Sequence, residues 1–234
     1  MARDLEHPAV GEGGDTDWSS LYRCRGDEVT SFRPVFTGDV FTDIGVDEDV
    51  RATVIVLQHP CALRVDGVKL IERILVAQVE HSRLLSVAEW VGNYKKFPLP
   101  ELIDGAHFAA NLAGLILAPS MAFDPVQRVA SLSQSGVNLL LQRWVHHNSR
   151  AIIPTWQYQE VTSPEFDEAD LMEEWCEDQV ADGQSIQEVT VTAHEWLRSD
   201  SGNGETWQSL LQDPQKRSTV RKAMRARLQR ISLG

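Results

Sequence analysis

The spacing of apolar residues changes from strand spacing to helix spacing near the middle of the chain, and this change constrains the fold most. From residue 31 to about 118, short runs of β-branched and aromatic residues alternate with turn signals. From Ser133 onward, apolar residues recur every three or four positions. The pattern predicts an α+β protein, with a small β-barrel at 31–125 and a helical region at 126–234 that packs on the barrel or extends from it.

Strands are expected at 35–44, 52–57, 94–100 and 107–117. The apolar run at 71–79 is too short to separate strand from helix by spacing alone. Asp66-Gly67 has the composition of a two-residue hairpin turn. Pro98 and Pro100 place the strand at 94–100 on an edge, because proline cannot donate a hydrogen bond within a central ladder.

Helix start signals mark the second half. Ser133 is expected to cap a first helix, and Ser163-Pro164-Glu165 resembles the start of a second one. Ser185 and Glu188 fit a capping box, although the β-branched residues at 189–192 keep a strand open as an alternative. A basic helix with one apolar face is expected at 220–231.

Residues 1–30 are rich in glycine and acidic residues around positions 11–17 and contain little to bury. A segment of this composition cannot offset the entropy of ordering by burial. We therefore expect an acidic, disordered tail without a function of its own.

Charge and cysteine content limit the class of protein. The net charge of −12 argues against broad binding to nucleic acid, which needs a basic surface. Cys24, Cys61 and Cys176 are few and scattered, which fits a reducing compartment better than a disulfide framework. The start of the chain lacks the pattern of a signal peptide, and no apolar run is long enough to cross a bilayer. These features predict a soluble cytoplasmic protein without membrane contact.

Charges separate along the helical half. Acidic residues gather at 165–178 and basic residues at 216–230. The simpler interpretation is two helices that face each other with opposite charges. The alternative is a surface for RNA, DNA or an acidic partner protein, and its contacts would be Arg217, Arg221, Lys222 and Arg225. No aromatic residues interleave with these cations to stack on bases, so we prefer the simpler interpretation.

Three segments, at 33–41, 54–59 and 73–79, resemble in order the opening of PemK/MazF-like toxins. The first contains Gly38-Asp39, the second is a valine-rich strand that ends in His59, and the third is another valine-rich strand. The resemblance covers about residues 30–80 and implies an SH3-like barrel in a prokaryotic defence or stress system of the toxin–antitoxin kind. It also implies a metal-independent endoribonuclease, but the arginine-rich active loop and the later Thr or Ser of those toxins have no secure counterpart here.

His59, Cys61 and Arg64 follow the buried run at 54–57 and form the candidate catalytic site. A cysteine beside a cation can act as a thiolate nucleophile, and a histidine and an arginine can serve as base and phosphate-stabilising cation in RNA cleavage. The structural alternative is simpler: free cysteine is often a small buried hydrophobe, and no third orienting residue is identifiable.

No cofactor or metal is expected. His146 and His147 are adjacent, and neighbouring residues on a helix do not share a face that could hold one ion. No phosphate-binding glycine loop is present either. The tryptophans are expected to anchor packing, and one or two exposed ones would indicate an interface. The sequence therefore favours a non-enzymatic interaction module with a protein partner in a larger assembly, with the PemK/MazF-type endoribonuclease as the alternative.

Overall fold

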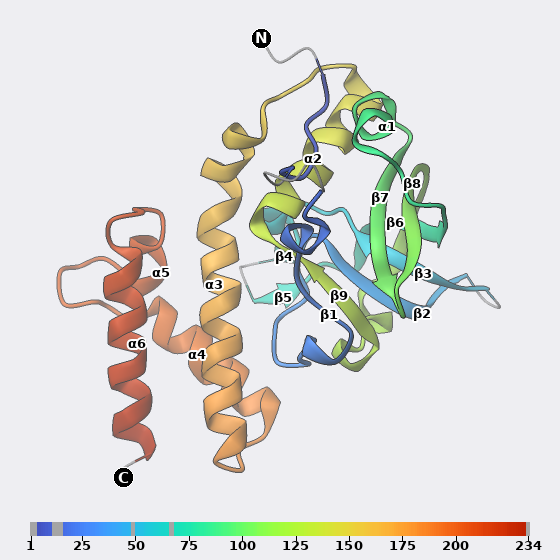
Figure 1. Cartoon of the computed structure of the whole chain (residues 1–234). Helices are drawn as coiled ribbons and strands as arrows, with labels where there is room; N and C mark the ends of the chain where they lie inside the picture. Colours follow the sequence, from blue (N-terminus) through green and yellow to red (C-terminus); the bar gives the residue numbers. More distant parts are fainter. Residues whose placement is uncertain (1–3, 11–15, 48–49, 66–67, 233–234) are drawn as a thin grey trace. The chain divides into compact units, whose positions relative to one another are not determined.

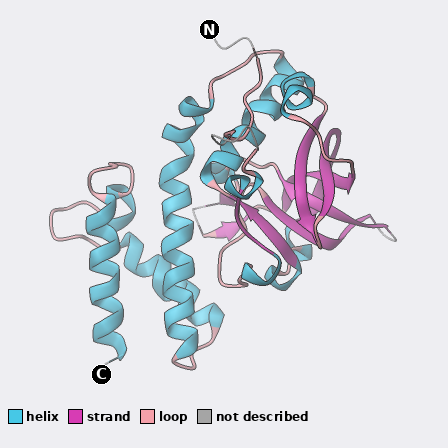
Figure 2. Ribbon diagram, in the orientation of Figure 1, coloured by secondary structure: helices cyan, strands magenta, loops and turns pink. Residues whose placement is uncertain are grey.

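The computed structural model describes residues 4–10, 16–47, 50–65 and 68–232 (Figure 1). The chain forms two compact units. Unit 1 contains Met1–Thr30 and Val35–Thr162, and unit 2 contains Ser31–Pro34 and Ser163–Gly234. Strands lie in unit 1 and the longest helices in the second half of the chain (Figure 2). The expected α+β fold, a barrel followed by helices, is confirmed.

Unit 1 is a nearly closed, antiparallel barrel of seven strands in the order β1-β9-β2-β3-β6-β8-β7. The strands are β1 (Tyr22–Arg25), β2 (Asp39–Asp47), β3 (Val50–Val56), β6 (Arg73–His81), β7 (Lys96–Ile103), β8 (Ala106–Pro119) and β9 (Arg128–Leu132). A separate two-stranded ladder joins β4 (Arg64–Val65) to β5 (Lys69–Leu70). The predicted Asp66-Gly67 turn lies outside the described residues.

The barrel is held together by the apolar face of each strand. Phe41, Ile44, Val54, Val56 and Ile74 are fully buried in one cluster. The run at 71–79, which spacing alone left open, is a strand because it pairs with both β3 and β8. β7 stands at the end of the strand order, as its prolines predicted.

The first 30 residues differ from the expected disordered tail. Tyr22–Arg25 forms β1 and pairs with β9, and Leu5 and Leu21 are buried. The backbone of Leu21 also accepts a hydrogen bond from Ser133 N, next to Gly136, where an added Cβ would lie 2.3 Å from the Leu21 oxygen. A few well-placed apolar contacts thus order a segment that is polar on average, and the barrel extends beyond the predicted limits of 31 and 125.

Helices and short 3-10 turns complete unit 1. The α-helices are α1 (Val87–Gly92) and α2 (Gln134–Ser149), and the Ser133 side chain caps α2 as predicted, accepting from Gly136 N. The 3-10 turns are η1 (Trp18–Leu21), η2 (Gly26–Glu28), η3 (Pro60–Ala62), η4 (Ser120–Ala122) and η5 (Pro125–Gln127). These turns mostly connect strands, and η3 carries part of the candidate site.

Unit 2 is helical. Its elements are most of α3 (Thr155–Ala181), with α4 (Ile186–Arg198), α5 (Trp207–Leu210) and α6 (Arg217–Ser232). Ser185 caps α4 by accepting from Glu188 N, so the strand alternative at 189–192 is wrong and the cap is confirmed. The Glu188 carboxylate accepts from Ser185 Oγ (2.8 Å), whereas a capping box would use the Ser185 backbone N–H. None of the helices in the described ranges is both long and apolar enough to cross a membrane.

The predicted helix start at Ser163-Pro164 is wrong, because α3 begins at Thr155 and Pro164 lies inside it. Proline removes one backbone donor from a helix interior and disfavours continuation. Here Thr162, Ser163 and Pro164 are all buried. Burial of this turn therefore outweighs the local penalty, and the start signal in the sequence is overridden by packing.

A buried ion pair fixes the start of β2. The Asp39 carboxylate lies 3.1 Å from Arg128 Nε, and both side chains are almost completely buried. The same carboxylate accepts hydrogen bonds from Ser131 Oγ (2.7 Å) and Phe36 N (2.8 Å). Arg128 Nη1 donates to the carbonyl oxygen of Thr30 (3.2 Å). Asp39 and Arg128 thus connect β2, β9 and the chain before β2.

We expect Asp39→Asn to lower the free energy of unfolding by about 3 kcal/mol, because it leaves the Arg128 charge buried without its counter-charge. The matched control is Asp43→Asn, which removes the exposed Asp43–Arg51 pair and should cost less than about 1 kcal/mol. Urea unfolding followed by circular dichroism measures both. Equal losses in the two variants would contradict the role assigned to Asp39.

Candidate functional site

The structure brings His59 and Cys61 together at the end of β3. Leu57 N donates to Leu75 O (2.9 Å), which holds the chain against β6, and Thr37 Oγ1 donates to Gln58 O (2.5 Å). Pro60 then starts the η3 turn, which folds the backbone so that His59 Nδ1 lies 2.9 Å from Cys61 Sγ. On an extended strand the two side chains would share a face but stand about 6.6 Å apart, so the turn is what brings them into contact.

Burial lowers the pKa of the His59 imidazole below its ordinary value. The ring is therefore neutral at neutral pH, and a standing pair of thiolate and imidazolium is disfavoured. Cys61 is exposed, so reagents in solvent can reach its sulfur. Cys61 is thus an accessible thiol beside a neutral base. The His59 imidazole can take up the thiol proton during a reaction.

Arg64 lies in β4, three positions after Cys61. Its Nη2 donates to the carbonyl oxygen of Val35 (2.9 Å), and its side chain is half-buried. This bond attaches β4 to the segment that precedes β2. Of the three predicted catalytic residues, His59 and Cys61 are in direct contact, whereas Arg64 has a structural hydrogen bond.

The basic helix α6 pairs with the acidic side of α3 within unit 2. Arg217 Nη1 lies 2.9 Å from Asp167, and Arg221 Nη1 lies 3.5 Å from Glu174. Arg225 Nε donates to the same Glu174 carboxylate. Three of the four predicted contact residues thus have acidic partners in their own chain, which confirms the simpler interpretation of the charge pattern. Lys222 is exposed.

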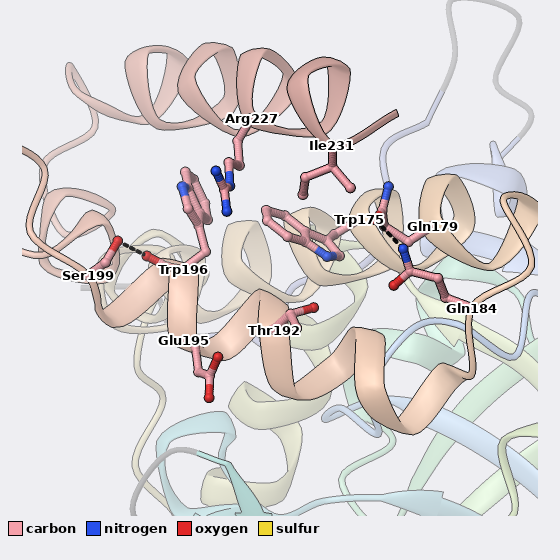
Figure 3. Close-up of a pocket in the computed structure, with 9 residues that line it drawn as sticks. All are labelled: Trp175, Gln179, Gln184, Thr192, Glu195, Trp196, Ser199, Arg227 and Ile231. Atoms are coloured by element: carbon pink, nitrogen blue, oxygen red, sulfur yellow. Dashed lines mark hydrogen bonds between the residues drawn. The ribbon is translucent and has the colours of Figure 1, made fainter. Parts of the chain in front are cut away.

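Sequence reasoning did not find a pocket of about 480 Å³ in unit 2 (Figure 3). Its residues come from α3, α4, α6 and the α3–α4 turn: Trp175, Gln179, Gln184, Thr192, Glu195, Trp196, Ser199, Arg227 and Ile231. The signal in the sequence was the pair of tryptophans, which we assigned to packing. Only a structure shows that α6 brings a cation beside them.

No group of three or more His, Cys, Asp and Glu side chains that could hold a metal ion occurs in the part of the chain that the structure describes. His146 and His147 both pack near Tyr94, and His147 Nδ1 lies 3.1 Å from the carbonyl oxygen of Tyr94. These histidines are held by local contacts at the end of α2.

Comparisons of the chain with known protein families, with characterised proteins and with solved structures give no match. The site must therefore be interpreted from its own geometry.

We expect iodoacetamide to modify native Cys61 first, because Cys24 and Cys176 are buried and burial raises the pKa of the Cys176 thiol. His59→Ala should slow modification of Cys61 on the order of tenfold, since the neighbouring base is lost. Because burial lowers the pKa of His59, its imidazole should still be mainly neutral at pH 6.5, where an ordinary histidine is half protonated. The wild type should therefore still be modified faster than His59→Ala at this pH.

Peptide mass spectrometry over time gives the rate at each cysteine. His81→Ala, which changes an exposed histidine on β6, is the matched control and should leave the rate unchanged. If His59→Ala reacts as fast as the wild type, the imidazole does not activate the thiol.

Proposed function

We propose that this protein is a non-enzymatic interaction module that binds a partner protein in a larger assembly. The observation that carries the proposal is an apolar outer face on the barrel. Leu115 and Leu117 in β8 point outward with 38% and 53% of their surface exposed. Leu75 in β6 lies directly opposite Leu117 in the strand register and is half-buried. We call Leu75, Leu115 and Leu117 the β8 face.

The backbone next to the β8 face supports the same proposal. In the described residues, the register pairs Leu115–Pro119 with β6 alone, whereas the first half of β8 pairs with both β6 and β7. A strand with one strand partner can pair with a further chain along its other side. The carbonyl oxygen of Leu117 accepts from Arg73 Nη1 (2.9 Å), so a further chain would have to displace that bond. Met121 and Val126, which follow β8, are 93% and 78% exposed and extend the apolar surface along the sequence.

The net charge of −12 indicates the chemistry of the partner. A second copy of this chain would bring like charges together, which disfavours self-association. A partner with an apolar centre and a basic rim fits better. The PemK/MazF-like segments at 33–41, 54–59 and 73–79 make a prokaryotic defence or stress system the setting that we propose.

The test is a pull-down from the native host with the full chain as bait. We expect a basic partner to be recovered by the wild type and lost by the double variant Leu115→Ser/Leu117→Asp, because the substitutions place polar groups at the centre of the interface. The matched control Val191→Ser removes an exposed apolar side chain from α4 and should retain the partner.

Light scattering of the purified wild type accompanies the pull-down. A monomer that recovers no partner, or a partner bound equally well by the double variant, would overturn the proposed role of the β8 face.

The endoribonuclease is the second candidate, and one observation favours it. The neutral imidazole of His59 is in the protonation state that a general base for a 2′-hydroxyl requires. Arg64 would have to exchange its bond with Val35 for a phosphate oxygen in order to stabilise the transition state. Because catalysis would require this exchange and the protein is acidic, we prefer the interaction module to the endoribonuclease as the proposed function.

Incubation of purified protein with single-stranded RNA in EDTA separates the two functions. We expect the RNA to remain intact with the wild type, with His59→Ala and with Arg64→Ala. Cleavage by the wild type that both variants lose would establish the metal-independent ribonuclease instead, while cleavage that neither variant changes would exclude this site.

A further inference from the structure

The pocket in unit 2 has two aromatic sides. Trp175 from α3 and Trp196 from α4 lie with ring centroids 5.5 Å apart and planes inclined by 32°. Trp207 stacks on the far side of Trp196, at 5.4 Å and 14°, and fixes its orientation. Trp196 is half-buried and presents part of a flat, rigid indole to the pocket, whereas Trp175 is almost completely buried.

Trp175 also carries a polar group that the fold leaves unused. Its side chain is 2% exposed, and its indole nitrogen is buried without a hydrogen-bond partner. Figure 3 shows this ring in the middle of the lining residues, with its nitrogen on the side of Thr192. An indole N–H is a donor only, and burying it unpaired costs free energy that a ligand with an acceptor would recover.

A second donor in the pocket, the Arg227 guanidinium, is also left without a partner in the described part of the chain. Arg227 reaches from α6 toward the two indoles (Figure 3), and among the described residues it has no hydrogen-bond or ion-pair partner. The buried Gln179 accepts a hydrogen bond from Gln184 Nε2 (3.0 Å) and donates from its own Nε2 to the Asp178 carboxylate (3.1 Å). Glu195 contributes the one carboxylate of the lining, and Figure 3 shows it directed away from the indoles.

We propose that this pocket binds a small planar organic monoanion of the aromatic carboxylate class. The ring would lie against the exposed part of Trp196, and the carboxylate would pair with Arg227 and accept from Trp175 Nε1. The volume of about 480 Å³ suits a ligand of this size. A single arginine balances one negative charge, which favours a carboxylate over a phosphate dianion. The inference concerns unit 2 and is independent of the β8 face.

The test is calorimetric titration of the full chain with 2-naphthoate as the probe. We expect saturable binding at one site, weakened about tenfold by Arg227→Gln, because a charge-assisted pair is lost. Trp175→Phe keeps an aromatic ring, removes the N–H, and should also weaken binding. Neutral 2-naphthamide should bind about tenfold more weakly than 2-naphthoate. Arg230→Gln, on the same helix and outside the pocket, is the matched control and should bind as the wild type does.

A second titration uses adenosine monophosphate as the probe, since it combines a flat ring with a phosphate. Tighter binding of this nucleotide than of 2-naphthoate would overturn the assigned ligand class. The site itself would be overturned if 2-naphthoate does not saturate the protein below about 1 mM, or if Arg227→Gln binds it as well as the wild type. Arg227 is exposed, so its variant should fold even if Trp175→Phe does not.

Discussion

The buried pair of Asp39 and Arg128 is the interaction on which the rest of the structure depends. Asp39 receives the backbone N–H of Phe36, and Arg128 donates to the carbonyl oxygen of Thr30. These two bonds hold both flanks of the Ser31–Pro34 segment, which itself belongs to unit 2. Within unit 2, Arg33 pairs with Asp170 and Glu173 and lies over the Phe166 ring. Residues on both sides of Ser31–Pro34 are thus bonded to this ion pair within unit 1, while Arg33 balances two carboxylates within unit 2.

The sequence was sufficient for features that depend on local spacing. Runs of β-branched, aromatic and other apolar residues predicted β2, β3 and β8, and prolines predicted the edge position of β7. Ser133 and Ser185 predicted the starts of α2 and α4. It was insufficient where distant contacts decide. β1 and β9 are short, and they are ordered by pairing with distant strands: β1 pairs with β9, and β9 also pairs with β2. Pro164 stays inside α3 because its turn is buried, which no local signal could show.

The candidate sites also differ in whether local spacing or distant contacts determine them. The opposite charges of α3 and α6 could be matched from sequence, since the two blocks are long and of opposite sign. The contact of His59 with Cys61 depends on the η3 turn between them, and the reduced basicity of His59 depends on burial. Neither the contact nor the reduced basicity can be predicted from the spacing of residues in the sequence. The pocket beside Trp175 is lined by residues of three helices, α3, α4 and α6. The sequence could therefore identify its tryptophans as packing residues but could not show that they line a pocket.

The position of Ser31–Pro34 has a consequence for synthesis on the ribosome. The chain emerges from its N-terminus, so Arg33 is complete long before Asp170 and Glu173 exist. All strands of the barrel, through β9, precede α3 and can pair while the helices are still being translated. During that interval Arg33 lacks the two carboxylates with which it pairs in the folded chain. The residues of unit 2 after Thr162 are synthesised last, and without Ser31–Pro34 they would lack one part of their own interior.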